Sequence, residues 1–363
     1  MKIYTLLSST TNLSQISGDK INELAIYSAM SLFADVYYNN QKLNFDAPNF
    51  GVDINRPIEK PSKKYDFYYI RAAPKIFLST HGPKAWMASP YNDLCYREAD
   101  AIVTFTNSWK KLLTKGSKVS VPGLTRGLIE RPKKVITFDQ VVPDFFVPKK
   151  DHAITSDFRS KFNADFIIGH FGRMSKATYP HSLMLVVDRL RNSFPDKKIE
   201  LIHAGNIQSN VMAKVKNNIR SMGRYKYENM PYAISACDVV TCNSRQGAAN
   251  WAGCKDVLEG MACGVPVLSG NYEVRKEQLG ADYEFFWPYD LTSTGPRISQ
   301  AAEDAMFNHL KKIIDYKFFN NTNDNWLDLI INNQLKRVKY YRKDNVAKRI
   351  EKDIIDVINN FKK

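Results

Sequence analysis

Short hydrophobic runs alternate along this chain with longer segments in which hydrophobic positions recur every three or four residues. Runs of the first kind predict buried strands, and segments of the second kind predict helices that pack on them. The series opens with a strand at Lys2–Leu7, a helix from Asp19 and a strand from Ala34. Because strands that alternate with helices form parallel sheets covered by helices, the pattern predicts an α/β fold of the Rossmann-like type.

The same alternation continues through both halves of the chain. In the first half we expect strands at Tyr65–Ile70, Lys75–Ser79 and Ala99–Thr104, whereas the polar, proline-marked residues 40–64 predict no regular element. The second half predicts further strands and helices, at 156–162, 166–171, 182–194, 199–204, 211–221, 231–237, 239–242 and 265–268. Helical spacing is also clear near the end of the chain, over 298–316, over 326–341 and from Asn345 onwards.

Length and spacing together predict two domains. A chain of 363 residues is long for a single hydrophobic core and fits two domains of about 150 to 200 residues. We place the boundary near residue 150, so that residues 1–150 form one Rossmann-like domain and residues 151–341 form the other. The C-terminal helix, at about 342–363, is expected to cross back to the N-terminal domain.

One stretch, Cys237–Leu268, combines a buried strand, a loop of small residues, a helix and a second buried strand. This is a βαβ unit, and ligands bind parallel sheets at the carboxyl ends of their strands. Glu259 lies on the helix of the unit, close to that edge. A single carboxylate among backbone N–H groups can accept two hydroxyl donors, such as those of a ribose. The alternative for Glu259 is a structural role near a helix N-terminus, where the helix dipole favours a negative charge.

The residues from Glu259 to Val267 read Glu-Gly-Met-Ala-Cys-Gly-Val-Pro-Val. This segment resembles the donor-sugar signature of the retaining nucleotide-sugar glycosyltransferases of glycosyltransferase family 4, in which Glu-Ala-Met-Ala-Cys-Gly-x-Pro-Val is common. The resemblance is strong over residues 135–290. It implies a GT-B fold, in which two Rossmann-like domains face a cleft and the last helix returns to the first domain. It also implies an enzyme that uses a nucleotide sugar, with a UDP-sugar as the expected donor.

Carried over residue by residue, the resemblance assigns Gly172 and Arg173 to the donor diphosphate, where a guanidinium stabilises the negative charge that grows on the leaving oxygen. Lys176 is the nearest lysine to the position where the family has Lys-Gly, and Thr178 occupies that position itself. His81 follows a predicted strand, where the family has a histidine near the donor sugar; a surface role is the alternative. The expected donor-binding residues are Gly172, Arg173, Glu259, Gly205, Ser244, Asn250, Trp251 and Gly18.

Trp251 marks the main departure from the family. It stands where the family has a glutamate that contacts the sugar, eight residues before Glu259. The departure leaves the identity of the donor sugar open, and it keeps a catalytically inactive nucleotide-binding module as an alternative. No Asp-x-Asp pair or His/Glu/Asp cluster has metal-ligand spacing, so the expected reaction needs no metal and no other cofactor. In such enzymes the acceptor attacks the sugar on the same face from which the leaving group departs, so the anomeric carbon keeps its configuration.

The net positive charge of the chain bears on which molecule accepts the sugar. The formal net charge is +15, and residues 1–150 carry 21 Lys and Arg against 13 Asp and Glu. Such a surplus favours nucleic acid, an anionic membrane surface or a phosphorylated substrate, with a merely solvated surface as the bland alternative. Phage enzymes that glycosylate hydroxymethylated cytosine in DNA are GT-B proteins too, and one resembles this chain in the Gly-Arg and Ala-Cys-Gly segments. The expected acceptor-binding lysines, the first three on one helix, are Lys110, Lys111, Lys115, Lys133 and Lys134.

The tentative acceptor is therefore the hydroxymethyl group of modified cytosine in double-stranded DNA. The alternative is an acceptor of surface-glycan or glycolipid synthesis at an anionic membrane. No apolar run approaches the roughly 20 residues of a transmembrane helix, and the N-terminus has no signal-peptide pattern. The five cysteines are odd in number and have no metal-ligand spacing, so we expect reduced thiols and a cytoplasmic location.

Overall fold

The computed structural model describes residues 1–7, 18–53, 56–88, 92–116, 118–119, 129–172, 174, 180–215, 217–223, 225–242, 255–288, 298–319 and 325–363. These residues divide into two compact units. The first unit contains Met1–Pro143 and Tyr340–Lys363, and the second contains most of Asp144–Lys339. Each unit has a parallel sheet covered by helices, so the predicted α/β fold class is confirmed.

The described part of the first unit is built on a sheet whose strand order is β3-β2-β1-β4-β5-β6-β9. All neighbouring strands are parallel except β3, which pairs antiparallel with β2 at the edge. Strands β4, β5 and β6 are buried at every position, as expected for strands covered on both faces. The elements before the last helix are β1 (Lys2–Leu6), α1 (Gly18–Met30), β2 (Asp35–Tyr38), β3 (Gln41–Lys42), η1 (Pro48–Gly51), β4 (Phe67–Ile70), α2 (Pro74–Leu78), β5 (Lys84–Met87), α3 (Asp93–Glu98), β6 (Ala101–Thr104), α4 (Asn107–Thr114), β7 (Lys118–Val119), β8 (Ile129–Glu130) and β9 (Val135–Thr137).

Two sequence-based predictions in this unit are wrong. Lys75–Ser79 was expected to be a strand, but Pro74–Leu78 forms helix α2 because Pro74 supplies a preset φ at the first helical position. Lys115 was expected on the same helix as Lys110 and Lys111. That helix, α4, ends at Thr114, and Lys115 is the capping residue that follows it.

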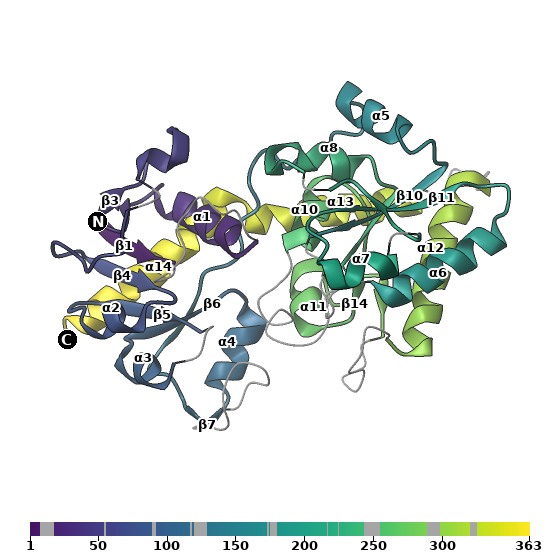
Figure 1. Ribbon diagram of the computed structural model, residues 1–363. Coiled ribbons are helices and arrows are strands. Elements are labelled where there is room, and N and C mark those ends of the chain that lie inside the picture. The colour runs from purple at the N-terminus through teal and green to yellow at the C-terminus, as the bar shows by residue number, and fades with distance from the viewer. Residues whose placement is uncertain are drawn as a thin grey trace. The chain divides into compact units, whose positions relative to one another are not determined.

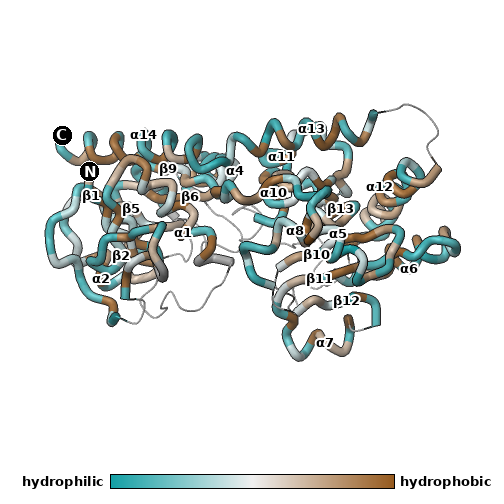
Figure 2. Tube along the Cα trace, turned by 90° about the horizontal axis from the view of Figure 1, so that it is seen from above, coloured by the Kyte–Doolittle hydropathy of each residue, from teal (hydrophilic) through white to brown (hydrophobic). Residues whose placement is uncertain are grey.

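The last helix, α14 (Lys343–Phe361), belongs to the first unit, as predicted, and packs against α1 and β9 (Figure 1). Hydrophobic and hydrophilic residues alternate along it (Figure 2). Its buried stripe contains Val346, Ile350, Ile354 and Val357. The Asp353 carboxylate also accepts a hydrogen bond from the backbone N–H of Thr137 at the end of β9, at 3.1 Å. Burial of this stripe is what ties the end of the chain to the N-terminal sheet.

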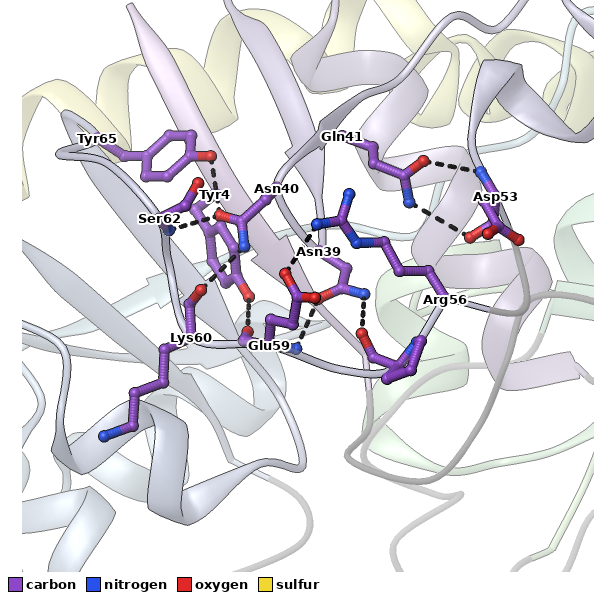
Figure 3. A network of polar contacts seen from close by, with 11 residues as sticks. Tyr4, Asn39, Asn40, Gln41, Asp53, Arg56, Glu59, Lys60, Ser62 and Tyr65 are labelled. Atoms are coloured by element: carbon purple, nitrogen blue, oxygen red, sulfur yellow. Dashed lines mark hydrogen bonds and ion pairs between the residues drawn. The ribbon is translucent and has the colours of Figure 1, made fainter.

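A ladder of three side-chain amides fixes part of the loop that the sequence left without structure (Figure 3). Asn39 and Asn40 form the β2–β3 turn, with φ of 49° and 68°. The Asn39 amide donates to Pro57 O at 2.8 Å and accepts from Glu59 N at 2.9 Å. Asn40 makes the same two bonds to Lys60 O and Ser62 N, and Gln41 makes them to the backbone of Asp53. Each amide therefore replaces the backbone partner that a neighbouring strand would supply.

The described sheet of the second unit has the strand order β12-β11-β10-β13-β14-β15, and every pair in it is parallel. Counted along this unit, the order is 3-2-1-4-5-6, that of the doubly wound dinucleotide-binding fold. The chain order reverses between β10 and β13. In open sheets of this kind ligands bind beside such a reversal, outside the carboxyl ends of the strands.

The elements of the second unit are α5 (Ala153–Ser160), β10 (Phe166–Phe171), α6 (His181–Ser193), β11 (Ile199–Ala204), α7 (Ser209–Val215), β12 (Arg220–Ser221), η2 (Tyr227–Asn229), α8 (Met230–Ser235), β13 (Val239–Cys242), α10 (Lys255–Ala262), β14 (Val267–Gly270), α11 (Glu273–Leu279), β15 (Phe286–Trp287), α12 (Gln300–Phe319) and α13 (Trp326–Val338). A short 3-10 helix, η3 (Lys339–Tyr341), precedes α14. The predicted helix over 211–221 is shorter than expected, because α7 ends at Val215 and β12 then adds an edge strand.

Helix α10 lies unusually close to the sheet. A Cβ at Gly260 would stand 2.5 Å from Val240 Cγ2 and 3.0 Å from Val267 Cγ2, so only glycine allows this approach. The helix ends at Ala262, and Gly264 follows it with a φ of +67°, the left-handed conformation that favours glycine after a helix. The close packing fixes the position of the neighbouring Glu259.

Candidate active site in the second unit

Two glycines end adjacent strands at the carboxyl edge of the second sheet. Gly172 follows β10 with φ +107°, and Gly205 follows β11 with φ +148°. A Cβ at Gly205 would stand 1.8 Å from the carbonyl oxygen of Gly172, so no other residue fits there. A Cβ at Gly172 would meet no atom of the described residues within 4 Å. The open side of Gly172 is therefore backbone that a ligand can approach closely.

Backbone hydrogen bonds connect the segment that follows Gly172 to the segment that follows Gly205. Gly172 N donates to Ala204 O at 3.0 Å, Met174 N donates to Asn206 O at 2.8 Å, and Gln208 N donates to Met174 O at 3.0 Å. The residues on both sides of position 173 are thus held by backbone hydrogen bonds. Arg173 itself lies outside the described residues, as does Lys176, so their predicted contacts with a diphosphate stay predictions.

A buried histidine pair lies just before the two glycines. His170 and His203 are register partners on β10 and β11, and both are at most 5% exposed. His203 Nδ1 lies 2.8 Å from the carbonyl oxygen of His170 and 3.2 Å from His170 Nδ1. Burial is the main cause that lowers the pKa of His170 to about 3 and that of His203 to about 4. Both rings are therefore neutral near pH 7, and they act as polar packing under the strand ends.

Glu259 lies on the second turn of α10 and is 6% exposed. Its Oε1 accepts a hydrogen bond of 2.6 Å from the hydroxyl of Tyr227, in η2. The Tyr227 ring packs against Phe145 and Phe146, with centroids 5.7 and 5.3 Å away, and these contacts fix the hydroxyl. Because a carboxylate has about four lone-pair positions, the bond to Tyr227 leaves Glu259 able to accept from further hydroxyl donors.

A lysine stands one helical turn before this carboxylate. Lys255 is the first residue of α10, and its Nζ lies 5.1 Å from the centroid of the Tyr227 ring. Burial lowers the pKa of Lys255 and raises the pKa of Glu259. The Lys255 charge and the hydrogen bond from Tyr227 act against the shift at Glu259, because both stabilise its ionised form. Tyr227, Glu259 and Lys255 thus form one buried, electrostatically linked cluster.

Sequence reasoning found Glu259 but missed Tyr227 and Lys255. A signal for Lys255 existed, since residues four apart lie on the same face of a helix. Tyr227 is 32 positions from Glu259, and no local pattern in the sequence connects the two. Only the packing of η2 against α10 brings the hydroxyl to the carboxylate.

The remaining predicted donor residues differ in what the structure describes. Ser244, Asn250 and Trp251 lie outside the described residues. Gly18 is the first residue of α1, and His81 is exposed shortly after α2; both belong to the first unit. Of the predicted sites, Gly172, Gly205 and Glu259 therefore have a described place in the second unit. The predicted roles of all of them stay predictions.

The five predicted acceptor-binding lysines belong to the first unit. Lys111 and Lys115 are exposed at the end of α4, and Lys110 is half-buried on the same helix. Lys133 is exposed, whereas Lys134 Nζ pairs with Asp356 of α14 at 2.8 Å. Lys134 is therefore the least suited of the five to contact a phosphate, because a carboxylate already neutralises it.

Two properties of the described residues bear on partners. Within them, no three His, Cys, Asp or Glu side chains are grouped closely enough to bind a metal ion. Among the described helices, none combines the length and hydrophobicity that a membrane crossing requires. Metal independence stays a prediction.

Comparison with protein families gives one match. Residues 154–317, within the second unit, match the family described as "Glycosyl transferases group 1". The matched range includes β10, β11 and α10, and with them Gly172, Gly205 and Glu259. Comparison with curated protein sequences gives no match.

Solved structures of GT-B glycosyltransferases resemble the whole chain. A sucrose-phosphate synthase from Thermosynechococcus elongatus has a TM-score of 0.69 at 11% identity, covering 99% of this chain and 100% of that one. HepE of Anabaena, solved with UDP and glucose, has a TM-score of 0.65 at 14% identity, and the match covers 98% of this chain and 100% of HepE. An E. coli trehalose-6-phosphate protein bound to UDP-2-fluoro glucose has a TM-score of 0.60 at 8% identity, and the match covers 97% of this chain and 98% of that one. At such low identities these likenesses show the fold.

Proposed function

We propose that this chain, which is a glycosyltransferase with a GT-B fold and a group 1 family domain, takes its sugar from a UDP-sugar held by the second unit. The structures of HepE with UDP-glucose and of the E. coli protein with UDP-2-fluoro glucose support UDP as the nucleotide. The sugar passes to a hydroxyl group of the acceptor. As the family 4 signature implies, the sugar keeps its configuration at the anomeric carbon.

The observation that carries the donor proposal is the buried carboxylate of Glu259. A carboxylate that is 6% exposed costs free energy unless it is hydrogen-bonded, and Tyr227 uses only part of its accepting capacity. The 2′- and 3′-hydroxyls of a ribose are two adjacent donors that a single carboxylate can accept. We therefore assign the ribose diol to Glu259.

The diphosphate is assigned to the strand ends beside Gly172 and Gly205. Backbone without a Cβ allows phosphate oxygens to come close to N–H groups, and a guanidinium then supplies the balancing charge. This role falls to Arg173, with Lys176 as a second cation. When the glycosidic bond breaks, the negative charge on the leaving phosphate is largest, and these cations stabilise it. The leaving phosphate oxygen then takes the proton of the attacking hydroxyl.

The donor proposal is tested with a panel of radiolabelled nucleotide sugars that differ in base and in sugar. We expect the protein to hydrolyse or transfer from at least one UDP-sugar, and UDP to inhibit the reaction. Nucleotide binding without hydrolysis or transfer for every donor would instead support an inactive binding module. The panel also addresses the sugar, which Trp251 leaves open.

For the acceptor, we propose the hydroxymethyl group of modified cytosine in double-stranded DNA. The support is the charge: the excess of 8 basic residues in 1–150 and the exposed lysines Lys111, Lys115 and Lys133. Phosphates of a DNA backbone are the ligands that such a surface favours. The alternative acceptor is a glycan or glycolipid at an anionic membrane, which the same charge also attracts.

The two acceptors are separated by supplying both with the same donor. The DNA proposal expects labelled sugar on duplexes that contain hydroxymethylcytosine and none on duplexes with unmodified cytosine. Transfer to a lipid-linked acceptor in anionic vesicles, with none to modified DNA, would replace the DNA proposal by the alternative. The unmodified duplex is the matched control, because it has the same phosphate charge and lacks the hydroxyl.

A further inference from the structure

The Lys255 ammonium is buried at the start of α10. Its Nζ is inaccessible to solvent, and no hydrogen-bond partner for it exists among the residues that the structure describes. The ring of Tyr227 lies beside it, with its centroid 5.1 Å from Nζ. A ring face attracts a cation, but it does not accept three N–H donors in the way that oxygen atoms do.

An unpaired buried cation is costly, and proteins keep such groups where a ligand completes them. Burial lowers the pKa of Lys255, and the Glu259 carboxylate one turn along the helix acts against this shift without supplying a hydrogen bond to the ammonium. Lys255 is also the first residue of α10, an eight-residue helix whose N-terminus favours negative charge. Both features select an anionic oxygen as the missing partner.

The distance from Lys255 to Glu259 indicates which anionic oxygen this is. Four residues along a helix correspond to about one turn, or about 5.4 to 6 Å. In a nucleoside diphosphate, only the C5′ methylene and an ester oxygen separate the ribose ring from the first phosphate. A ligand whose ribose is bound at Glu259 can thus place a phosphate one turn nearer the helix N-terminus, at Lys255.

We propose that Lys255 is a donor-recognition residue whose ammonium binds a phosphate oxygen of the nucleotide while Glu259 holds the ribose. The inference rests on the proposed function, because it uses the ribose position assigned there. In the free protein the ammonium is buried without an acceptor among the described residues, and a phosphate oxygen of the bound nucleotide supplies that acceptor. The phosphate contact therefore comes from a side chain as well as from backbone.

The test compares Lys255→Met with the wild-type protein and with Lys161→Met. Met keeps the length of the side chain and removes the charge, while Lys161 is an exposed lysine of the same unit that pairs with Asp157. We expect Lys255→Met to weaken UDP binding about 10- to 100-fold in isothermal titration calorimetry. Binding of uridine, which has the ribose and no phosphate, should change less than about threefold. Lys161→Met should bind both as wild type does.

Thermal unfolding of the free proteins supplies an independent readout. Lys255→Met removes the cost of burying the ammonium and also its attraction to Glu259, so the variant should unfold at nearly the wild-type temperature. Equal losses of UDP and uridine affinity would overturn the inference and make Lys255 a residue that acts through Glu259. Unchanged UDP affinity would overturn it as well. If wild-type protein binds neither UDP nor uridine, the proposed function itself fails, and that result is separate from the other two.

Discussion

At the scale of single residues, the buried groups of the second unit differ in whether they have partners. His170 and His203 are uncharged near pH 7 and contact each other through their Nδ1 atoms, although His203 Nε2 has no partner among the described residues. Lys255 carries an ammonium that lacks an acceptor among the same residues. The histidine pair fits a structural role, since it packs under the strand ends that carry Gly172 and Gly205. We therefore expect substitution of the histidines to change the stability of the fold, and substitution of Lys255 to change ligand binding.

The histidine pair predicts how stability depends on pH. In the folded chain both pKa values lie below 6.5, at about 3 and about 4, so the unfolded chain binds more protons between about pH 4 and 6.5. Stability should therefore fall as the pH falls through that window, and the pair should have no effect above it. Each histidine contributes a slope of about 1 kcal/mol per pH unit near pH 5.5.

Urea unfolding at several pH values measures this slope. His203→Asn should lower the slope between pH 5 and 6 by about 1 kcal/mol per pH unit, whatever it does to the stability at pH 7. Comparing slopes removes the effect of packing changes, which shift all pH values equally. A variant with the wild-type slope would show that His203 is not a buried neutral group.

Arg173 predicts a catalytic defect. If its guanidinium meets the charge that develops on the leaving phosphate, Arg173→Ala should reduce kcat/KM by about 100-fold or more, equivalent to about 2.7 kcal/mol. Arg189→Ala is the matched control, because Arg189 lies in the same unit and pairs with Asp304 at 2.8 Å. Steady-state kinetics with the preferred donor provide the measurement. Wild-type kinetics in Arg173→Ala would remove this residue from the mechanism.

At this scale the sequence predicted the residues that belong to a local pattern. Glu259 and the Gly172 strand end were found because the motif and the strand pattern are continuous in the sequence. Tyr227 was not, since its contact with Glu259 depends on how η2 packs on α10. That Lys255 has no acceptor among the described residues follows from its burial, which the residue type alone does not reveal.

At the scale of elements, the amide ladder of Asn39, Asn40 and Gln41 predicts a stability effect. Asn39→Gly keeps a residue that tolerates the positive φ and removes two hydrogen bonds to the 57–59 backbone. We expect a loss of about 1 to 3 kcal/mol in the unfolding free energy of the first unit. Asn40→Gly is the comparison, because its hydrogen bonds are exposed and should cost less.

Urea unfolding of the two variants decides between these expectations. A loss in Asn39→Gly no larger than that in Asn40→Gly would show that the buried amide does not hold the loop. No sequence pattern indicated this ladder, because the paired segments are 12 to 22 positions apart. Side-chain amides that replace a neighbouring strand have no periodic pattern to detect.

The errors in element prediction have physical causes too. Lys75–Ser79 is short and apolar enough to resemble a strand, but Pro74 and the absence of a partner register favour one helical turn. The buried strands and the stripe of α14 were predicted well, because their periodicity comes directly from the face that is buried. Periodicity therefore located most elements, and short elements were the ones misassigned.

At the scale of the whole molecule, the distribution of charge predicts how DNA binding responds to salt. Counterion release gives log K a slope of about −0.9 per phosphate contacted in log salt. About five contacts would therefore reduce affinity several hundred-fold between roughly 50 and 200 mM salt. Fluorescence anisotropy with a labelled duplex provides the measurement.

Three lysines on α4 and directly after it supply the matched variant. Changing Lys110, Lys111 and Lys115 to Glu should lower DNA affinity and reduce the salt slope. It should leave UDP binding intact, because these residues belong to the first unit and Glu259 belongs to the second. DNA binding with little salt dependence, or a charge-reversed protein that binds DNA as tightly as wild type, would contradict the proposed role of the charge.

The assignment of the ribose diol to Glu259 is tested most directly by changing the carboxylate and the diol together. UDP and 2′,3′-dideoxy-UDP are titrated into the wild-type protein and into Glu259→Gln. We predict that loss of the diol weakens binding to wild type about tenfold or more and hardly weakens binding to Glu259→Gln further. Equal losses in both proteins would show that the hydroxyls do not contact Glu259, and would contradict the donor site proposed here.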